Sequence, residues 1–460
     1  MDGLIQRASE LASIIKDHEK VHIVTHIDAD GITAGAIAAK TLDRLNKPYS
    51  IEFIKQVDKK TIEKLEKNNH DLVWFTDLGS SIADKKTVFS KIIADHHVCE
   101  MKTDYDFHCN PHLFGIDGSY MISGAGVTYL VSKEIDKKNM DLSMLAIVGA
   151  NGDLQQRKHQ KLVGLNRDIL KDGIQTGVIE EKIDIQYFGR ETRPIYKLLQ
   201  YANDPIIPGV TGLESNAISF LTKLSIPLKD GKTWRRWIDL NNDERSIILS
   251  EIASLLLSKG FGHKHVKRLI GNVYILSKET FGSELHDAKE FATLLNSTAR
   301  YGDYEVGLQV CMGDREKALT SARSLLKGHR HNLVEGMQFA KTEGIHIREY
   351  VQYFHAKNGI RDTIVGIVTN MLLNDAETRN DLPLIGFAIK NEGEVKASAR
   401  TTQDIVEKGI DLSEIIKNAA TTVDGVGGGH NIAAGATIPK GKEEAFLTAF
   451  ENEIKNQLSS

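Results

Sequence analysis

The sequence predicts an α/β protein, and three observations support this fold class. Between residues 20 and 97, four short apolar runs alternate with helical segments, which is typical of βαβ units whose strands form a parallel sheet covered on both faces. From about residue 190 to 340, apolar residues recur at spacings of three and four, as they do in amphipathic helices. After about residue 345 the chain returns to alternating strands and helices.

These patterns divide the chain into three parts. We expect an N-terminal parallel-sheet domain at 1–190, a mostly helical segment that could bind a partner at 191–340, and a smaller C-terminal α/β domain at 341–460. The length of 460 residues also favours two or three domains, because it exceeds what one hydrophobic core usually serves.

Each expected element rests on its own apolar pattern. Short apolar runs predict N-terminal strands at 20–27, 49–57, 70–78 and 90–97. Helical spacing predicts helices at 31–45, 61–68, 124–135 and 143–154, and longer amphipathic stretches at 235–260 and 288–313. In the C-terminal part we expect a strand at 347–357, a helix at 361–374 and a hairpin at 382–401 with Gly393 in its turn.

Composition excludes several classes of protein. A net charge of −4 disfavours a strongly basic nucleic-acid coat protein, although a local basic groove remains compatible with it. No apolar run of about 18 residues is present, and the first residues lack the order of a signal peptide. The three cysteines have no C-x-x-C spacing, which disfavours a disulfide framework and a thiolate zinc site. We therefore expect a cytoplasmic protein without a membrane partner.

Acids and histidines stand where the expected strands end, which is where ligands collect in open parallel sheets. The first strand runs into "HIDADG", where period-two spacing in an extended segment would direct His26, Asp28 and Asp30 to one side. Five further residues follow the third strand, the fourth strand and a later helix: Asp77, the run Asp95-His96-His97, and Asp153.

This mixed set of imidazoles and carboxylates predicts a metal centre. Such ligands suit Mn²⁺, Mg²⁺, Fe²⁺ or Zn²⁺. With one shared carboxylate they would fill two sites about 3.5–4 Å apart, an arrangement that activates a bridging water for attack on phosphorus. Each motif alone has an ordinary interpretation as a helix cap, a turn or a packed histidine pair. The coincidence of all of them at strand or helix ends favours the metal.

The motifs also resemble a known family. In order and spacing, "HIDADG", "FTDLGSS", "ADHH" and "GANGD" resemble the four motifs of the DHH phosphoesterase superfamily. The tail "GVGGGHNIAAGATIP", with "KASAR" upstream, is similar to the associated C-terminal domain of that superfamily. The forms H-x-D-A-D-G and G-G-G-H resemble RecJ-like single-strand exonucleases. The length and the helical middle are most similar to the archaeal RecJ group, relatives of a replicative-helicase subunit that binds the GINS complex.

The resemblance implies a role for each residue of the expected metal centre. It implies two divalent ions, with Mn²⁺ ahead of Mg²⁺. His26 and Asp28 would hold one ion, Asp30, His96 and Asp153 the other, and Asp77 would bridge them. His97 would face the scissile phosphate, and Asp95 would accept a ring N–H of a ligand and so fix its tautomer. None of the six ligand positions is substituted, which implies that catalysis is retained.

The glycine run near the C-terminus has two interpretations. It could be a flexible loop beside a buried histidine, or its backbone N–H groups could approach a phosphate closely. The resemblance favours phosphate binding in a cleft between the two α/β domains. The residues expected there are Arg400, Ser398, Gly428, Gly429 and His430.

Two further stretches leave their alternatives open. The N–H groups of 123–126, before a helix, could receive a phosphate or belong to an ordinary capped helix. Trp234 and Trp237, beside Arg235 and Arg236, could stack a base. The helical spacing of the two tryptophans favours the other interpretation, the edge of a core with a basic rim.

The resemblance implies a metal-dependent exonuclease that degrades single-stranded DNA 5′→3′, with RNA as a further substrate, in replication or repair. The implied partners are single-stranded nucleic acid and the GINS or replicative-helicase complex. One alternative keeps the chemistry but changes the substrate, to oligoribonucleotides or cyclic dinucleotides. Another is a replisome scaffold whose nuclease activity is secondary.

Overall fold

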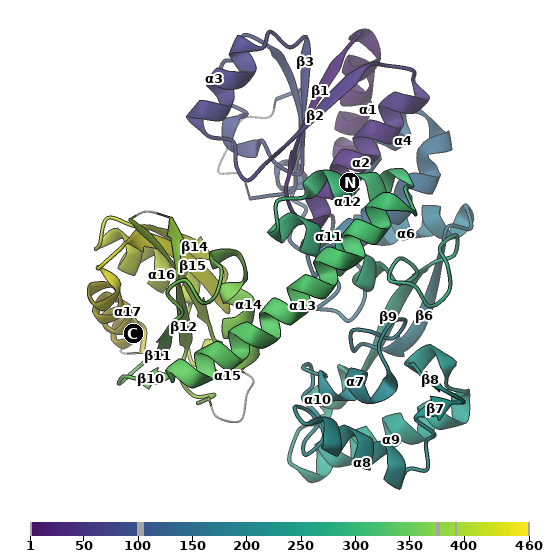
Figure 1. Ribbon diagram of the computed structural model, residues 1–460. Helices are drawn as coiled ribbons and strands as arrows, with labels where there is room; N and C mark the ends of the chain where they lie inside the picture. Colours follow the sequence, from purple (N-terminus) through teal and green to yellow (C-terminus); the bar gives the residue numbers. More distant parts are fainter. Residues whose placement is uncertain (1, 99–104, 374–377, 392, 459–460) are drawn as a thin grey trace. The chain divides into compact units, whose positions relative to one another are not determined.

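The computed structural model describes residues 2–98, 105–373, 378–391 and 393–458 and is drawn in Figure 1. It has two compact units, residues 1–325 and 326–460. The predicted fold class is confirmed, with an N-terminal parallel sheet, a helical middle and a C-terminal α/β domain. The three-part division at 190 and 340 stays a prediction. Within the described ranges, no helix combines the length and the apolar character needed to cross a membrane.

The first unit begins with a parallel sheet. Its described strands lie in the order β2-β1-β3-β4-β5. They are β1 (Val21–His26), β2 (Tyr49–Ile54), β3 (Leu72–Thr76), β4 (Ser90–Ala94) and β5 (His108–Cys109). Every residue of β3 is buried, because helices cover both faces of the sheet. The carboxyl ends of β1, β3 and β4 meet at one edge, as expected for parallel neighbours.

Helices cover this sheet on its two faces. The helices on the sheet are α1 (Asp2–Asp17), α2 (Ala29–Arg44), α3 (Lys59–Lys67) and α4 (Gly124–Ile135). Two more helices form a further layer, in which α5 (Ser143–Gly152) packs on α2 and α4, and α6 (Leu165–Gln175) packs on α5. On one face, Leu65 of α3 packs in a cluster with Val24 and Phe75. On the other, α2 comes so close that a Cβ on Gly35 would lie 3.0 Å from side-chain atoms of Ile51 and Thr25. Almost all of α2 is buried.

The middle of the chain forms a module with its own hydrophobic core. A two-stranded antiparallel sheet, β6 (Ile179–Ile185) with β9 (Ile270–Leu276), leads into and out of it, and the sequence patterns did not predict this sheet. The elements between are α7 (Ile195–Gln200), α8 (Glu214–Lys223), β7 (Lys229–Asp230), β8 (Thr233–Trp234), α9 (Asn242–Ser258) and α10 (His263–Lys267). We call residues 187–270 the middle module. After it, α11 (Ala288–Arg300) and α12 (Tyr304–Met312) return to pack on α2.

The helical interpretation of the tryptophan pair is wrong. Trp234 lies in β8, and Trp237 begins a short 3-10 helix (Trp237–Asp239), so the two do not share a helix face. The expected helix starts only at Asn242, because Asn241 and Glu244 form a capping box there.

A buried arginine joins the middle module to α11. Arg190 donates to Asp184 at 2.7 Å and to Asp287, the residue that caps α11, at 2.6 Å. Trp237 in turn donates from its indole Nε1 to Asp184. Because these charges are buried and fully paired, removing one would leave another uncompensated, and that coupling holds the two parts together.

The second unit contains a mixed sheet in the order β10-β11-β12-β13-β15-β14. Its strands are β10 (His346–Ile347), β11 (Gln352–His355), β12 (Leu384–Asn391), β13 (Glu394–Arg400), β14 (Val426–Gly429) and β15 (Ala433–Pro439). Its helices are α14 (Asp362–Leu373), α15 (Gln403–Val406), α16 (Leu412–Thr421) and α17 (Glu443–Leu458), and α13 (Lys317–Glu343) leads into it from the first unit. The hairpin with Gly393 in its turn is confirmed. The flexible-loop interpretation of the glycine run is wrong, because it forms β14.

Candidate metal centre

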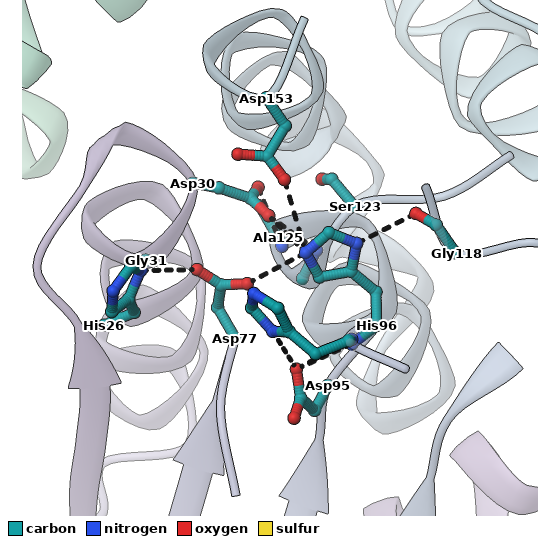
Figure 2. Close-up of polar contacts among 12 residues, drawn as sticks. His26, Asp30, Gly31, Asp77, Asp95, His96, Gly118, Ser123, Ala125 and Asp153 are labelled. Atoms are coloured by element: carbon teal, nitrogen blue, oxygen red, sulfur yellow. Dashed lines mark hydrogen bonds and ion pairs between the residues drawn. The ribbon is translucent and has the colours of Figure 1, made fainter. Parts of the chain in front are cut away.

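The carboxyl edge of the parallel sheet gathers the predicted metal ligands. His26 ends β1, Asp77 follows β3, and His96 follows β4 (Figure 2). Asp153 caps the carboxyl end of α5. Figure 2 shows Asp30, Asp77 and Asp153 directed toward the ring of His96. The residues that the strand-end rule selected therefore lie together at one edge of the sheet, and their role as metal ligands stays a prediction.

The first motif does not have the extended shape that its period-two spacing suggested. The strand ends at His26, and α2 begins at Ala29, because Asp28 caps the helix by accepting from the Gly31 N–H at 3.0 Å. Gly31 is required, since a Cβ there would lie 2.3 Å from the His26 carbonyl oxygen. The abrupt turn into α2 thus replaces the extended segment.

His26, Asp28 and Asp77 form one group of potential ligands. The His26 Nδ1 lies 3.1 Å from Asp28 Oδ2 and 3.5 Å from Asp77 Oδ2. The donor atoms of these three residues all lie within 4.8 Å of one another, close enough to surround a single ion. This is the grouping that the family resemblance implied for the first ion.

Asp30, His96 and Asp153 form a second group. The His96 Nε2 lies 3.2 Å from Asp153 Oδ2 and 3.7 Å from Asp30 Oδ2. It is also 3.3 Å from Asp77 Oδ1. Asp77 thus directs one carboxylate oxygen to each group, which is the geometry of a bridging ligand. A third group of the same kind joins His97 to Asp77 and His96.

The backbone around Asp77 is tightly constrained. Asp77 has a φ of +59°, a left-handed conformation that few non-glycine residues adopt. A Cβ on Gly124, at the start of α4, would lie 2.2 Å from Asp77 Oδ1. The shared carboxylate therefore depends on a glycine that offers no ligand of its own.

The carboxylate of Asp30, a residue of α2, lies at the amino end of α4. It accepts from the Gly124 N–H at 2.6 Å and from the Ala125 N–H at 3.1 Å, while Ser123 caps the helix. These N–H groups are satisfied by a protein carboxylate and are not free for a phosphate. The phosphate interpretation of 123–126 is therefore wrong, and the capped-helix interpretation holds.

The electrostatics of the cluster show a shortage of positive charge. Burial, followed by the neighbouring Asp77, raises the pKa of Asp30 to about 8. Burial and Asp30 likewise raise the pKa of Asp153 well above its usual range. Burial alone would lower the pKa of His26, but Asp28 and Asp77 outweigh it and raise that pKa to about 11. Protons are thus drawn to positions that a cation would fill.

Unpartnered atoms show that divalent ions fit these residues. His26 Nδ1, His96 Nε2 and Asp77 Oδ1 are buried and make no hydrogen bond within the described part of the chain. Buried polar atoms nearly always have such partners. Here the two ring nitrogens lie 3.1–3.7 Å from carboxylate oxygens, Asp77 Oδ1 among them, without hydrogen-bond geometry. One cation in each ligand group would satisfy all three atoms.

Asp95 orients a different ring from the one expected. It accepts from the ring Nδ1 of His97 at 2.8 Å, whereas the predicted ligand His96 donates to it only from its backbone N–H, also at 2.8 Å. The His96 Nδ1 instead lies 2.9 Å from the Gly118 carbonyl oxygen, which fixes its tautomer so that Nε2 faces the carboxylates. Asp95 therefore positions the exposed His97, the residue predicted to meet the phosphate. Burial would raise the pKa of Asp95, but His97 lowers it below its usual range.

A buried polar loop supports His97 and was missed by the sequence reasoning. Asn110 donates to the His97 carbonyl oxygen at 3.0 Å and to Ser80 Oγ at 2.9 Å. The Ser80 N–H donates to Asp95 Oδ2 at 3.0 Å. The available signal was weak, namely a polar residue before a proline at the end of a short strand.

Helix α11 also reaches the first motif. Asn296 accepts from the Ala29 N–H at 3.1 Å, next to Asp28. Burial lowers the pKa of Arg300 on the same helix, and Asp28 is the first charge that opposes this effect. No local sequence pattern connects residues so far apart along the chain, so neither contact was predictable.

The second unit brings the predicted phosphate-binding residues close together. In the strand register, Ser398 faces Gly435 on β15, and Gly435 faces Gly428 on β14, which gives a row of small residues across three strands. Arg400 and Gly429 lie at the same end of these strands, and His430 is in the turn that follows β14. A Cβ on Gly428 would have no atom within 4 Å, so this part of the face is open. The roles of these residues, and a cleft between the domains, stay predictions.

Three family models match the chain along its length. They are the N-terminal domain of the DHH family at 20–149, the DHH-CID domain at 187–270 and the DHHA1 domain at 344–456. MJ0831, an uncharacterized protein of Methanocaldococcus jannaschii, is 31% identical over 456 residues, which cover 97% of this chain and 95% of that protein.

Solved structures share the fold at low sequence identity. RecJ in complex with Mn²⁺ from Thermus thermophilus has a TM-score of 0.59 at 16% identity, over 99% of this chain but only 55% of that longer chain. An exonuclease RecJ bound to manganese has a TM-score of 0.58 at 16% identity, over 98% of this chain and 94% of that chain. CDC45 from Entamoeba histolytica has a TM-score of 0.65 at 12% identity, over 98% of this chain and 97% of that chain. At these identities the likeness shows the fold alone.

Proposed function

The chain is a RecJ-like member of the DHH superfamily, and from this premise we propose that it is an active metal-dependent phosphodiesterase that degrades single-stranded nucleic acid from one end. One observation carries the proposal. Two groups of imidazoles and carboxylates converge on the same sheet edge and share Asp77, which offers one oxygen to each group.

The main competing function is a scaffold without catalysis, since CDC45 has the same fold. A separate middle module with its own core supports that alternative, because such a module could bind a protein partner. Burying several carboxylates without a partner, however, destabilises a fold. A scaffold has no need of the buried Asp30 and Asp77 or of the unpartnered His96 nitrogen. These groups favour catalysis.

The proposed mechanism assigns a task to each side chain. His26 and Asp28 would hold one divalent ion, Asp30, His96 and Asp153 would hold the other, and Asp77 would contribute to both. When bound, the two ions supply an activated water and neutralise the charge that develops on phosphorus. His97, held by Asp95, contacts the scissile phosphate. RecJ structures of similar fold have been solved with Mn²⁺ and with Mg²⁺, and of these two ions we propose Mn²⁺ for this chain.

The second unit would hold the substrate. Arg400 suits bidentate contact with a phosphate. Ser398 and Gly428 lie in one register row through Gly435, and Gly429 and His430 lie at the end of β14, near the Arg400 end of β13. The open glycine there lets a nucleotide backbone approach the strand closely. We propose single-stranded DNA degraded 5′→3′ as the main substrate, RNA as a second, and a cytoplasmic role in replication or repair alongside a GINS-type or replicative-helicase complex.

An assay with end-labelled substrates tests this proposal. Single-stranded DNA, single-stranded RNA and a dinucleotide are each incubated with the full chain and Mn²⁺ or Mg²⁺, and the products are resolved by length. Stepwise shortening of the long strands is the expected result. Hydrolysis of the dinucleotide alone would favour the oligoribonuclease or cyclic-dinucleotide alternative, and no hydrolysis at all would favour the scaffold.

Asp77→Asn serves as the inactive variant in the same assay. Asp71→Asn is its matched control, because Asp71 is exposed at the opposite end of the same strand. Loss of hydrolysis in the first variant only would link the activity to the shared carboxylate.

A further inference from the structure

The middle module carries an alternating set of aromatic rings and cations on its surface. We call it the aromatic–cation ladder and define it by the residues Arg193, Tyr196, Lys197, Tyr201, Lys229 and Trp234. These residues come from α7, the segments that flank it, and the small β7–β8 hairpin. The proposed mechanism at the metal centre uses none of them.

Each member of the ladder contacts the next. The Arg193 guanidinium carbon lies 5.1 Å from the centre of the Tyr201 ring. Lys197 Nζ lies 5.7 Å from that ring and 5.4 Å from the ring of Tyr196. The Tyr196 and Trp234 rings are 4.8 Å apart, centre to centre.

The hairpin supplies the last step of the ladder. Lys229 Nζ lies 4.2 Å from the centre of the Trp234 ring. Cation–π contacts favour distances below about 6 Å, so the ladder is continuous from Arg193 to Lys229.

The neighbouring residues explain why only Trp234 reaches the surface. Trp237 is fully buried in the core of the module. Arg235 is held by Glu244 through two hydrogen bonds of 2.7 and 2.6 Å, and Arg236 is paired with Asp239. Both arginines are thus neutralised by carboxylates within the module. Of the two tryptophans in this stretch, only Trp234 is therefore accessible for stacking on a base.

The ladder is exposed and positively charged. Trp234 is 37% exposed and Tyr201 43% exposed, whereas Tyr196 is buried beneath them and supports the Trp234 ring. Of the three cations, Lys197 is paired with Glu214. Lys229 is exposed at the edge of the hairpin. Flat rings beside cations are the combination that binds a single strand, because bases stack on rings while cations meet phosphates.

We propose that the ladder binds single-stranded nucleic acid, with bases stacked on Trp234 and Tyr201 and backbone phosphates held by Lys229 and Arg193. The identity of the ligand rests on the proposed function. Two exposed rings beside the exposed Lys229 favour a ligand that offers both bases and phosphates. The ladder also belongs to the same compact unit as the metal centre, so a long strand can engage both while a dinucleotide engages only the metal centre.

Binding is measured with the full chain carrying Asp77→Asn, so that the strand is not degraded. Fluorescence anisotropy follows a labelled oligonucleotide of about 20 nucleotides, longer than the usual site of one binding domain. Trp234→Ala is expected to weaken binding about tenfold or more, because one stacked base is lost. Phe281→Ala is the matched control, since Phe281 is an exposed ring outside the ladder. Tyr201→Ala repeats the test at a second ring, and melting curves verify that each variant is folded.

Salt dependence gives a second readout that a structural role would not change. Lys229→Gln is expected to reduce the slope of log affinity against log salt by about 0.7, the value for one phosphate contact on a single strand. Lys232→Gln, in the turn of the same hairpin, is expected to leave the slope unchanged.

Unchanged affinity in both ring variants would overturn the proposal. The proposal would also be overturned if the ring variants lost binding to an acidic peptide but still bound the oligonucleotide. That result would assign the ladder to a protein partner. Failure of the proposed function is distinguishable, because binding is measured without catalysis. Hydrolysis of a dinucleotide by the parent chain tests the metal centre separately, and ladder variants are expected to leave that rate unchanged.

Discussion

The metal centre and the glycine-rich face of the second unit are built in opposite ways. At the metal centre, charged side chains are buried and held by backbone groups, as Asp30 is held by the N–H groups of α4. On the second unit's sheet, the row of small residues ends at Gly428, where a Cβ would meet no atom within 4 Å. In our proposal the first site depends on the charges of its side chains, and the second depends on the open space at Gly428. Charge removal should therefore damage the first site, and added volume should matter differently in each.

Removing the charge of Asp77 is expected to have the largest effect. Asp77→Asn keeps the shape of the side chain but leaves both groups of ligands without their shared carboxylate. We expect hydrolysis to fall about 10³-fold or more. Nuclease assays and metal analysis measure the effect, with Asp71→Asn as control. Retained activity with intact metal content would contradict the bridging role.

Added volume beside Asp77 should have a large effect without removing any ligand. In Gly124→Ala the new Cβ would lie 2.2 Å from Asp77 Oδ1 and displace it. We expect metal affinity to fall about 100-fold, as it does when other residues that position a metal ligand are substituted. Gly262→Ala, where a Cβ meets no atom within 4 Å, is the control. Equal metal affinity in the two variants would show that the glycine does not constrain Asp77.

Removing a charge from the second unit should affect substrate binding and not metal. Arg400→Ala loses a charge-assisted contact to phosphate, so KM for a single strand should rise about tenfold. Steady-state kinetics and metal analysis separate the two effects. Arg379→Ala, which removes an exposed arginine paired with Asp381 in the same unit, is the control. Loss of metal in the Arg400→Ala variant would show that Arg400 supports metal binding, which would contradict its assignment to phosphate binding.

Added volume on the open glycine face should have the smallest effect. In Gly428→Ala the new Cβ meets no atom within 4 Å, so the fold should tolerate it. We expect substrate affinity to change by about twofold and metal affinity not to change. Titration with a single strand and with Mn²⁺ measures both. A loss of metal here as large as in Gly124→Ala would remove the distinction between the two sites.

Many residues of the candidate metal centre could be predicted because each directly follows an element that the local sequence pattern identifies. Strand ends of a parallel sheet meet at one edge, so motifs after successive strands had to converge there. The spacing rule failed at His26–Asp30, because the Asp28 cap ends the extended segment earlier than period-two geometry assumes. Asp95 was placed at the right site, but its partner is His97, a choice that depends on ring orientation.

Other features depend on contacts between distant segments and were not predictable from pattern. Asn296 reaches Ala29 across most of the first unit's sequence. The glycine run forms an edge strand because β15 pairs with it, although glycine has little intrinsic preference for strands. The tryptophan pair was assigned to a helix because its spacing fits one, whereas the turn after β8 separates the two rings.

The number of Mn²⁺ ions bound per chain tests the central claim most directly. Metal analysis of the full chain, together with the magnetic coupling seen by electron paramagnetic resonance, measures it. The shared carboxylate predicts two coupled ions in the native chain and loss of the coupled pair in Asp77→Asn. A native chain that binds no Mn²⁺, or a single uncoupled ion that Asp77→Asn leaves in place, would contradict the account.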